Sequence, residues 1–461
     1  MGIDKFQTWI YNNHYNTIEP YDNGFYNHVY IDINYILHKL ISYSPDENTL
    51  IKNVIESIHS YFQNGNLKSI NLAVDGSANY AKILLQKKRR LLTQKRDDEK
   101  LSSIILTTGT QFMNKFDDEL KRHMENIKMG ENYKNLVINL NLSNNHGESE
   151  FKICNFLQKN CQNIFDTHLI VSNDADTILI SLSQLYAYNV HILVNIHNHH
   201  YTISIDKLTE DIFEEFGYNY LKKLDFVFIS LLNGNDYFPK LKYTNIDKLL
   251  KIYKETIDKK HTLINLDYSI NLILFQKFIF RLLMTIPPKI RYISANELVL
   301  TNIDNYFNGL QWCMQLYISG NYPTYKYICE TDVIHPMNLF QFLQKCEFNR
   351  QYKSIIIKHE NYIPISSNQY PLLIMPYSCI DLIPEKYHSI INEKLMYMFE
   401  EEFCKKCNAF RAKIKKYSDI NKKYNEKINA IRKKYISHRK THIIKDPVKY
   451  IDDIRTIIED V

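Results

Sequence analysis

Short β-branched or apolar runs that lead into acidic residues are the feature that most constrains this chain. Val-Tyr-Ile precedes Asp32, Leu-Ala-Val precedes Asp75, and Leu-Ile-Val-Ser-Asn precedes Asp174 and Asp176. One such aspartate is most often a helix N-cap, but three strands ending in the same way make N-capping alone a weak explanation. Because ligands bind beyond the carboxyl ends of parallel strands, we expect these acids to share one edge of a sheet.

The alternation of these runs with helical patterns over the first 240 residues indicates βαβ units. We predict strands at 28–33, 69–74, 136–141, 168–172, 191–196 and 202–205, with loop at 13–27 and helices through 77–130 and 242–290. After about residue 300 the alternation gives way to mainly helical sequence. The expected fold class is therefore α/β, a mostly parallel central sheet with flanking helices and a mainly helical C-terminal region packed on it.

Length and composition leave the class of protein open but exclude several. With 461 residues, 45% hydrophobic and 23% charged, the chain is neither disordered nor fibrous. A formal net charge of +6 is too small to indicate a nucleic-acid partner by itself. Eight scattered cysteines, an N-terminus without an apolar signal core and apolar runs too short for a bilayer predict an intracellular protein with no membrane contact.

Seven carboxylates in five short blocks form an ordered set, namely Asp32, Asp75, Glu148, Glu150, Asp174, Asp176 and Asp236. Like charges at close range raise one another's pKa, so such a set needs cations to stay ionised. Mg²⁺, with Mn²⁺ as a substitute, is the cation that suits oxygen ligands. Two ions roughly 3.5–4 Å apart stabilise both the attacking and the leaving oxygen of an in-line displacement. We therefore expect these seven residues to be both catalytic and metal-binding, in phosphodiester hydrolysis.

A cationic helix face follows Asp75. Lys82, Gln86, Arg89 and Arg90 stand at i, i+4, i+7 and i+8. By itself this run could equally be a solvated face or a nuclear-targeting signal. Beside a metal cluster, it predicts a grip on a terminal phosphate and hence an exonuclease acting from the 5′ end.

The chain resembles the XRN-type 5′→3′ exoribonucleases, distant relatives of the flap endonucleases and PIN-like nucleases. The matching motifs run in the family's order, at residues 1–10, 31–38, 74–90, 108–113, 147–152, 174–176, 225–239, 309–312 and 373–387. Asn79 and Tyr80 stand where the family usually has Pro and Arg. The chain is shorter than the large cytoplasmic members of the family, and its amino-acid usage is typical of an AT-rich genome. Both features resemble those of an enzyme carried by a large DNA virus.

The resemblance implies a PIN- or flap-nuclease-like core in which the seven acids bind two metal ions. It assigns the 5′-monophosphate to Lys82, Gln86, Arg89 and Arg90. It further implies that His38 stacks on a base near the 5′ end, with Trp312 as its aromatic partner, and base stacking is tolerant of sequence.

The same comparison divides the chain into four parts. These are an N-terminal nuclease domain at 1–255, a helical connection at 256–300, a second conserved block completing the active-site lobe at 301–395, and a basic helical tail at 396–461. The tail either extends the RNA path or packs on the catalytic lobe.

Cys404 and Cys407, with His438 and His442, offer the ligand types of a zinc site. The gap between the pairs is longer than the roughly 12–15 residues of the usual finger, so we expect these cysteines to be ordinary thiols rather than zinc ligands.

The leading hypothesis is a Mg²⁺-dependent 5′→3′ exoribonuclease that degrades 5′-monophosphorylated single-stranded RNA to nucleoside 5′-monophosphates. It would act as a cytoplasmic monomer, downstream of a decapping machinery, in the host cytoplasm if the chain is viral. The alternatives are a structure-specific 5′ flap DNA nuclease and a non-catalytic RNA-binding scaffold.

Overall fold

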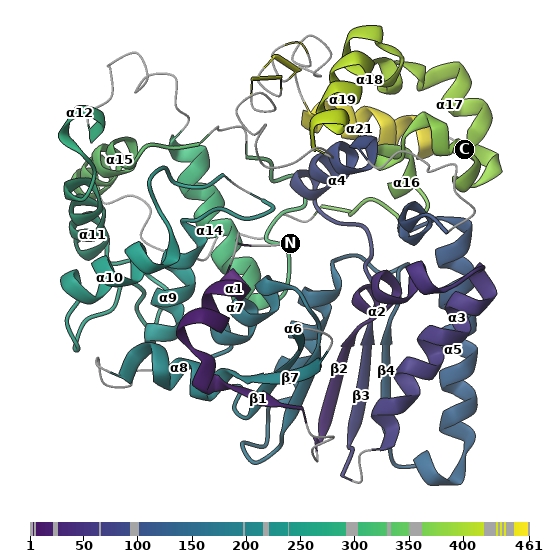
Figure 1. The fold of residues 1–461 in the computed structure, drawn as a ribbon, viewed down its shortest axis with the longest axis horizontal. Coiled ribbons are helices and arrows are strands. Elements are labelled where there is room, and N and C mark those ends of the chain that lie inside the picture. The colour runs from purple at the N-terminus through teal and green to yellow at the C-terminus, as the bar shows by residue number, and fades with distance from the viewer. Residues whose placement is uncertain are drawn as a thin grey trace.

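A seven-stranded sheet forms the centre of the protein in the computed structural model (Figure 1). Its strands are β1 (Ile18–Pro20), β2 (His28–Asp32), β3 (Ser69–Ala73), β4 (Val137–Asn141), β5 (His168–Val171), β6 (Val190–Ile196) and β7 (His199–Ser204), in the order β1-β7-β6-β5-β2-β3-β4. The structure describes residues 3, 6–21, 26–63, 66–92, 101–196, 199–214, 221–237, 239–291, 303–329, 333–349, 362–418, 430–431, 434–435, 438 and 447–459.

Strands β6, β5, β2, β3 and β4 are parallel, and β1 and β7 add an antiparallel edge. The predicted α/β class with a mostly parallel sheet is confirmed, and all six predicted strands are present with ends shifted by up to three residues. The prediction of loop at 13–27 was wrong for β1, which pairs Ile18 with Ile203. A three-residue edge strand has no periodicity of its own, and only its distant partner makes it a strand.

Successive side chains of the central strands point to opposite faces of the sheet and so belong to two separate cores. Val29 and Ile31 face the helices α2 (Ile33–Leu40), α3 (Glu47–His59) and α5 (Gln111–Met129). Tyr30, between them, faces the opposite core, as the period of two requires. That core is formed by α1 (Phe6–Asn13), α6 (Ser149–Asn160), α7 (Ala175–Ser183), α8 (Ile205–Phe213), α9 (Leu221–Leu231), α10 (Ile246–Thr256), α11 (Leu272–Met284), α14 (Ile303–Ser319) and α15 (Pro336–Asn349), with α12 (Pro288–Arg291) following α11.

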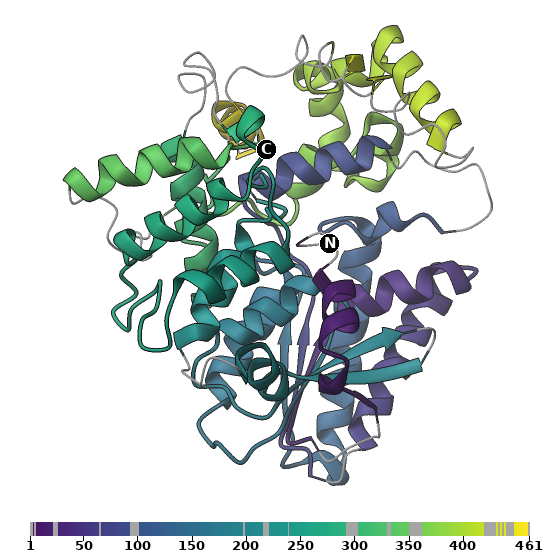
Figure 2. The same cartoon turned by 60° about the vertical axis from the view of Figure 1, so that its left-hand side comes forward.

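A third core lies around α4 (Tyr80–Leu92), the predicted cationic helix. Its other members are α16 (Tyr370–Ile374), α17 (His388–Lys394) and the C-terminal helix α21 (Pro447–Glu459). In Figure 2, α21 lies near the end marked C, and α18 (Glu400–Phe403) and α19 (Lys405–Ser418) lie apart from it at the upper right. Ile451 and Ile454 of α21 are buried there. Residues 447–459 therefore pack on the catalytic lobe, one of the two alternatives for the tail, while the predicted domain boundaries stay a prediction.

A buried polar contact fixes α21 to the start of α4. Tyr80 and Tyr362 each donate a hydroxyl hydrogen bond to Asp452 Oδ1 over 2.6 Å, and Lys326 Nζ lies 2.8 Å from Asp452 Oδ2. The C-terminal helix thereby contributes to the position of the helix that carries Lys82 and Arg89.

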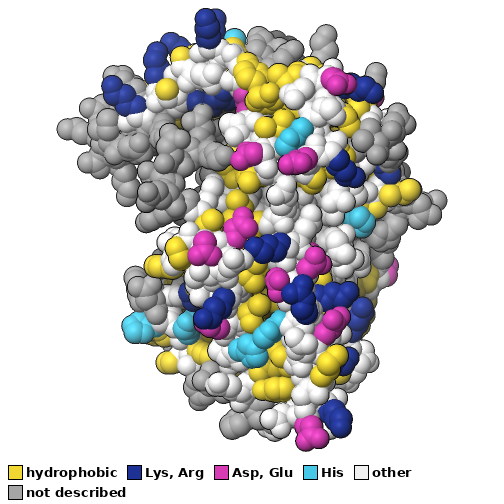
Figure 3. All heavy atoms as spheres, turned by 90° about the vertical axis from the view of Figure 1, so that its right-hand side faces the viewer, with side chains coloured by type: hydrophobic (Ala, Val, Ile, Leu, Met, Phe, Trp, Pro, Cys, Tyr) yellow, Lys and Arg dark blue, Asp and Glu magenta, His cyan; other side chains and the backbone are white. Residues whose placement is uncertain are grey.

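The surface away from the sheet edge is mixed in charge. No helix of the described residues is long and apolar enough to cross a bilayer. On the face shown in Figure 3, lysines and arginines are interspersed with acidic side chains, so the net charge does not gather there.

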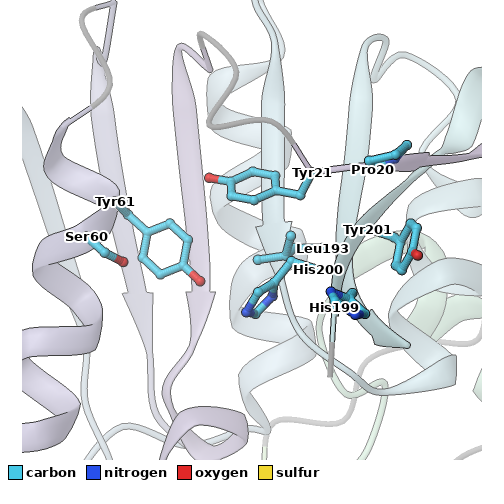
Figure 4. A pocket seen from close by; sticks show the side chains of 8 residues that line it. All are labelled: Pro20, Tyr21, Ser60, Tyr61, Leu193, His199, His200 and Tyr201. Atoms are coloured by element: carbon cyan, nitrogen blue, oxygen red, sulfur yellow. The ribbon is translucent and has the colours of Figure 1, made fainter. Parts of the chain in front are cut away.

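A cavity of about 580 Å³ beside β6 and β7, lined by Tyr21, Tyr61, His200 and their neighbours (Figure 4), contains none of the seven acids.

Candidate active site

Three neighbouring parallel strands deliver the aspartates that the sequence singled out. β5, β2 and β3 are adjacent in the sheet and lead into Asp174, Asp32 and Asp75. Asp32 caps α2 by accepting from Tyr35 N over 3.2 Å, and Asp174 caps α7 by accepting from Asp176 N over 3.0 Å. The N-cap explanation therefore holds for Asp32 and Asp174, where a helix begins as the strand ends, whereas Asp75 precedes α4 by five residues and caps no helix after β3.

Glu148 and Glu150 reach the same edge through a close approach of two loops. Gly76 N donates to Gly147 O over 2.9 Å, and a Cβ on Gly76 would meet Asn145 O at 1.7 Å. Gly147 itself has φ +96°, a conformation that favours glycine. The approach lets Asp75 Oδ1 accept from Ser149 N over 2.8 Å, which places Asp75 at the N-terminus of the helix that carries the two glutamates.

Lys82 lies among the acids. Its Nζ is 2.5 Å from Glu148 Oε1 and 2.9 Å from Asp236 Oδ2, and all three side chains are less than 10% exposed. Arg89 donates to both oxygens of Asp236, over 3.3 and 2.8 Å. The helix face predicted to hold a phosphate therefore contacts the acid cluster directly, through Asp236.

The other residues of the predicted phosphate and base sites are arranged differently. Gln86 is half-buried on α4 between Lys82 and Arg89. Arg90 turns away and donates to Ser103 O over 3.3 Å. His38 is exposed in the last turn of α2, where a base could reach it.

Trp312 does not lie where a base-stacking residue is expected. It is 1% exposed, its Nε1 donates to Thr324 O over 3.1 Å, and its ring stacks on Tyr327 and Tyr322 at centroid distances of 4.7 and 5.8 Å. The described structure therefore keeps Trp312 in the core and does not bring it to His38. Trp312 lies on the buried face of α14, which explains its burial. The sequence alone does not indicate whether a tryptophan in this helix faces the core or the substrate.

Repulsion within the cluster is visible in the protonation equilibria. Burial, followed by the charge of Asp75, raises the pKa of Asp32, and burial, followed by Asp174, raises the pKa of Asp176. Burial and Glu148 raise the pKa of Glu150 well above its usual range. These couplings show that the acids act on one another as a single cluster.

Two cations of the protein offset part of this repulsion. Although burial alone opposes it, Glu148 and Asp236 hold the pKa of Lys82 well above its usual value. Conversely, Lys82 and Arg89 lower the pKa of Asp236 against the effect of burial. Protein groups thus compensate part of the charge of Asp236.

The donor set fits hard divalent cations. Buried, mutually repelling carboxylates are the ligands that Mg²⁺ and Mn²⁺ prefer, and cations would relieve the repulsion. Among the described residues, however, three potential ligand atoms within 4.8 Å of one another occur at Cys404, Cys407 and His438 and not among the carboxylates. No three of the described acids have oxygens this close together, and Lys82 Nζ lies between Glu148 and Asp236.

Three supporting residues were not predicted from the sequence. Tyr237 and Tyr322 both donate to Glu148 Oε2, the latter over 2.8 Å. Lys152 donates to Val74 O, Leu142 O and Asn145 O over 2.6, 2.9 and 2.9 Å, which ties the end of β3 to the loop after β4. Lys152 and Tyr237 lie next to predicted acids, in the motifs 147–152 and 225–239, and could have been suspected. Tyr322 lies 174 residues from Glu148 and carries no local signal.

Among solved structures, the chain is similar to the catalytic core of Rad2 in complex with DNA substrate. One such structure is 13% identical, with a TM-score of 0.39, and the match covers 80% of this chain and 99% of that one. Another is 12% identical, with a TM-score of 0.38, covering 76% and 95%. At these TM-scores the likeness carries no argument, and the fold class rests on the sheet itself.

Two sequence comparisons are more specific. Over 256 residues the chain is 27% identical to "Putative 5'-3' exonuclease R528" of Acanthamoeba polyphaga mimivirus, a match that covers 49% of this chain and 40% of that relative. Residues 1–195, which contain six of the seven acids and the whole cationic helix, match the family described as XRN 5'-3' exonuclease N-terminus. Over these residues the chain is similar to the N-terminal part of the XRN 5'-3' exonucleases, and it spans less than half the length of the mimivirus relative.

Proposed function

We propose that the chain is a Mg²⁺-dependent 5′→3′ exoribonuclease that hydrolyses 5′-monophosphorylated RNA stepwise to nucleoside 5′-monophosphates. The observation that carries the proposal is the contact of Lys82 and Arg89 with Asp236, which puts two cations of one helix face beside an acid of the cluster. This arrangement supports the binding of a terminal phosphate by that helix face. A nuclease that binds the 5′-terminal phosphate beside its reaction centre removes nucleotides starting from the 5′ end.

The acids would hold the cations, with Asp32, Asp75, Glu148, Glu150, Asp174, Asp176 and Asp236 as the oxygen donors. Bound divalent cations supply charge neutralisation and water activation in such sites. Lys82 and Arg89 would bind the 5′-phosphate through charge-assisted hydrogen bonds, and His38, exposed on α2, would stack on a base. Tyr237 and Tyr322 orient Glu148 by hydrogen bonding to one of its oxygens.

The proposal is tested with RNAs of one sequence that carry a 5′-monophosphate, a 5′-triphosphate or a 5′-hydroxyl, each with Mg²⁺ and with EDTA. We expect rapid release of mononucleotides only from the monophosphate in Mg²⁺. Equal degradation of all three ends would refute the phosphate site. Asp174→Asn is the matched control for contaminating nucleases, since it should abolish cleavage and retain RNA binding.

A branched DNA with a 5′ flap completes the test. Preferred cleavage of this DNA over single-stranded RNA would replace the proposal by a flap nuclease. Binding of RNA without any cleavage would instead indicate a non-catalytic scaffold.

A further inference from the structure

A second group of metal-binding side chains lies in the C-terminal part, apart from the acid cluster. Cys404 immediately precedes α19, Cys407 belongs to its first turn, and His438 comes from a segment more than 30 residues later. One potential ligand atom from each lies within 4.8 Å of the other two. Cys407 is fully buried, and Cys404 and His438 are half-buried.

The spacing fits a small ion with sulfur and nitrogen ligands. Zinc binds sulfur at about 2.3 Å and imidazole nitrogen at about 2.0–2.1 Å in a tetrahedron, which separates a sulfur from a nitrogen by roughly 3.6 Å. The distance from Cys404 Sγ to His438 Nε2 is 3.3 Å. A thiol–imidazole hydrogen bond alone would account for this pair, but not for the approach of a buried second cysteine to the same point.

The chemistry of the donors selects the metal. Thiolates and imidazole prefer zinc to the hard cations that suit the carboxylate cluster. Both sulfurs lie at the start of α19, where the helix dipole favours the thiolate that a metal needs. The two cysteines are present as thiols and not as a disulfide.

We propose that Cys404, Cys407 and His438 bind a zinc ion that joins the first turn of α19 to the segment around His438. The sequence expectation of ordinary thiols rested on the long gap between the two pairs, and the fold closes that gap. His442 lies outside the described residues, and the proposal does not depend on it.

The role of the ion is structural. Phe410 of α19 packs near the rings of Tyr435 and His438, at centroid distances of 6.0 and 6.3 Å, so the ion and this small apolar contact hold the same two segments together. Just before Cys404, the carboxylate of Glu402 accepts from Tyr377 N over 3.0 and 2.9 Å. Through Tyr377 the zinc-bound unit is attached to the core around α4.

The test measures zinc in the purified full chain by mass spectrometry, after passage through a buffer with a weak chelator. We expect one zinc per chain, lost in Cys404→Ser, in Cys407→Ser and in His438→Ala. Cys161→Ser is the matched control, because this half-buried cysteine lies at the C-cap of α6 and packs against the core that contains α6, and it should retain the zinc.

Cobalt substitution of the wild-type chain keeps the proposal testable if the variants fail to fold. A thiolate-to-cobalt charge-transfer band in the wild type and in Cys161→Ser would support the site. Absence of zinc and of this band in the wild-type chain, zinc retained in all three variants, or a Cys404–Cys407 disulfide in the reduced preparation would each overturn it.

Discussion

Asp236→Asn is expected to tighten the binding of 5′-phosphorylated RNA even as it lowers cleavage. In the structure, Lys82 Nζ donates to Asp236 over 2.9 Å, and Arg89 donates to it over 3.3 and 2.8 Å. A terminal phosphate bound by Lys82 and Arg89 must compete with this carboxylate. Asparagine keeps one acceptor oxygen but has no charge, so the two cations become easier to recruit.

The size of the effect follows from the loss of the ion pairs, because both donors stay charged in the variant. Replacing the carboxylate by a neutral acceptor keeps a hydrogen bond with a charged donor but removes the charge–charge attraction, which we take as roughly 1 kcal/mol for each cation. Arg89 is about one-third exposed, at 34%, and its share is reduced by solvent. The sum, about 1.4 kcal/mol, corresponds to roughly a tenfold lower Kd.

The assay is fluorescence anisotropy in EDTA with a 5′-monophosphate RNA and its 5′-hydroxyl counterpart. Asp174→Asn is the matched control, because it removes one negative charge from the same cluster while the carboxylate of Asp174 accepts from Asp176 N rather than from a cation of α4. A general loss of repulsion would tighten the binding of both RNAs in both variants. Release of Lys82 and Arg89 from Asp236 would tighten the binding of the phosphorylated RNA alone, and only in Asp236→Asn.

Two results would refute this reasoning. One is an equal gain for both RNAs, which would reduce the effect to net charge. The other is a loss of affinity for the phosphorylated RNA in a variant that still unfolds at the wild-type temperature, which would show that Asp236 supports the phosphate site instead of competing with it.

Three further predictions concern the supporting structure. Tyr322→Phe removes one of the two hydroxyls that donate to Glu148, and we expect it to cost about 1.5–3 kcal/mol of stability and to lower kcat with KM unchanged; an unaltered thermal midpoint would contradict this. Asp176→Asn removes a repelling buried carboxylate and should therefore raise the thermal midpoint in EDTA, so a lower midpoint in EDTA would contradict the repulsion. The same variant should be stabilised less by Mg²⁺, whose binding at 100 times Kd contributes about 2.7 kcal/mol. Asp452→Ala leaves Tyr80 without its partner on α21, and faster proteolysis of the C-terminal helix together with slower cleavage is expected, whereas an unchanged proteolysis pattern would show that the apolar contacts suffice.

The sequence by itself determined the elements that depend on short-range patterns. Short β-branched or apolar runs predicted the strands, and the position of Asp32, Asp75 and Asp174 at the strand ends was enough to indicate a shared edge. Because the carboxyl ends of neighbouring parallel strands meet at the same edge of a sheet, a local pattern sufficed to predict an acid cluster. The cationic face of α4 was visible for the same reason, because helical periodicity is local.

Only the tertiary structure decided which side chains meet across long separations. It paired Lys82 with Asp236 over 154 residues and stacked Tyr322 and Tyr327 on Trp312. It also brought His438 to Cys404 and Cys407 despite the gap that had argued against a metal site. Such contacts depend on how the helices pack on the sheet and on one another, and packing is set by the whole chain. Local sequence patterns therefore predict which residues are candidates for the chemistry, whereas the fold determines which distant side chains contact them.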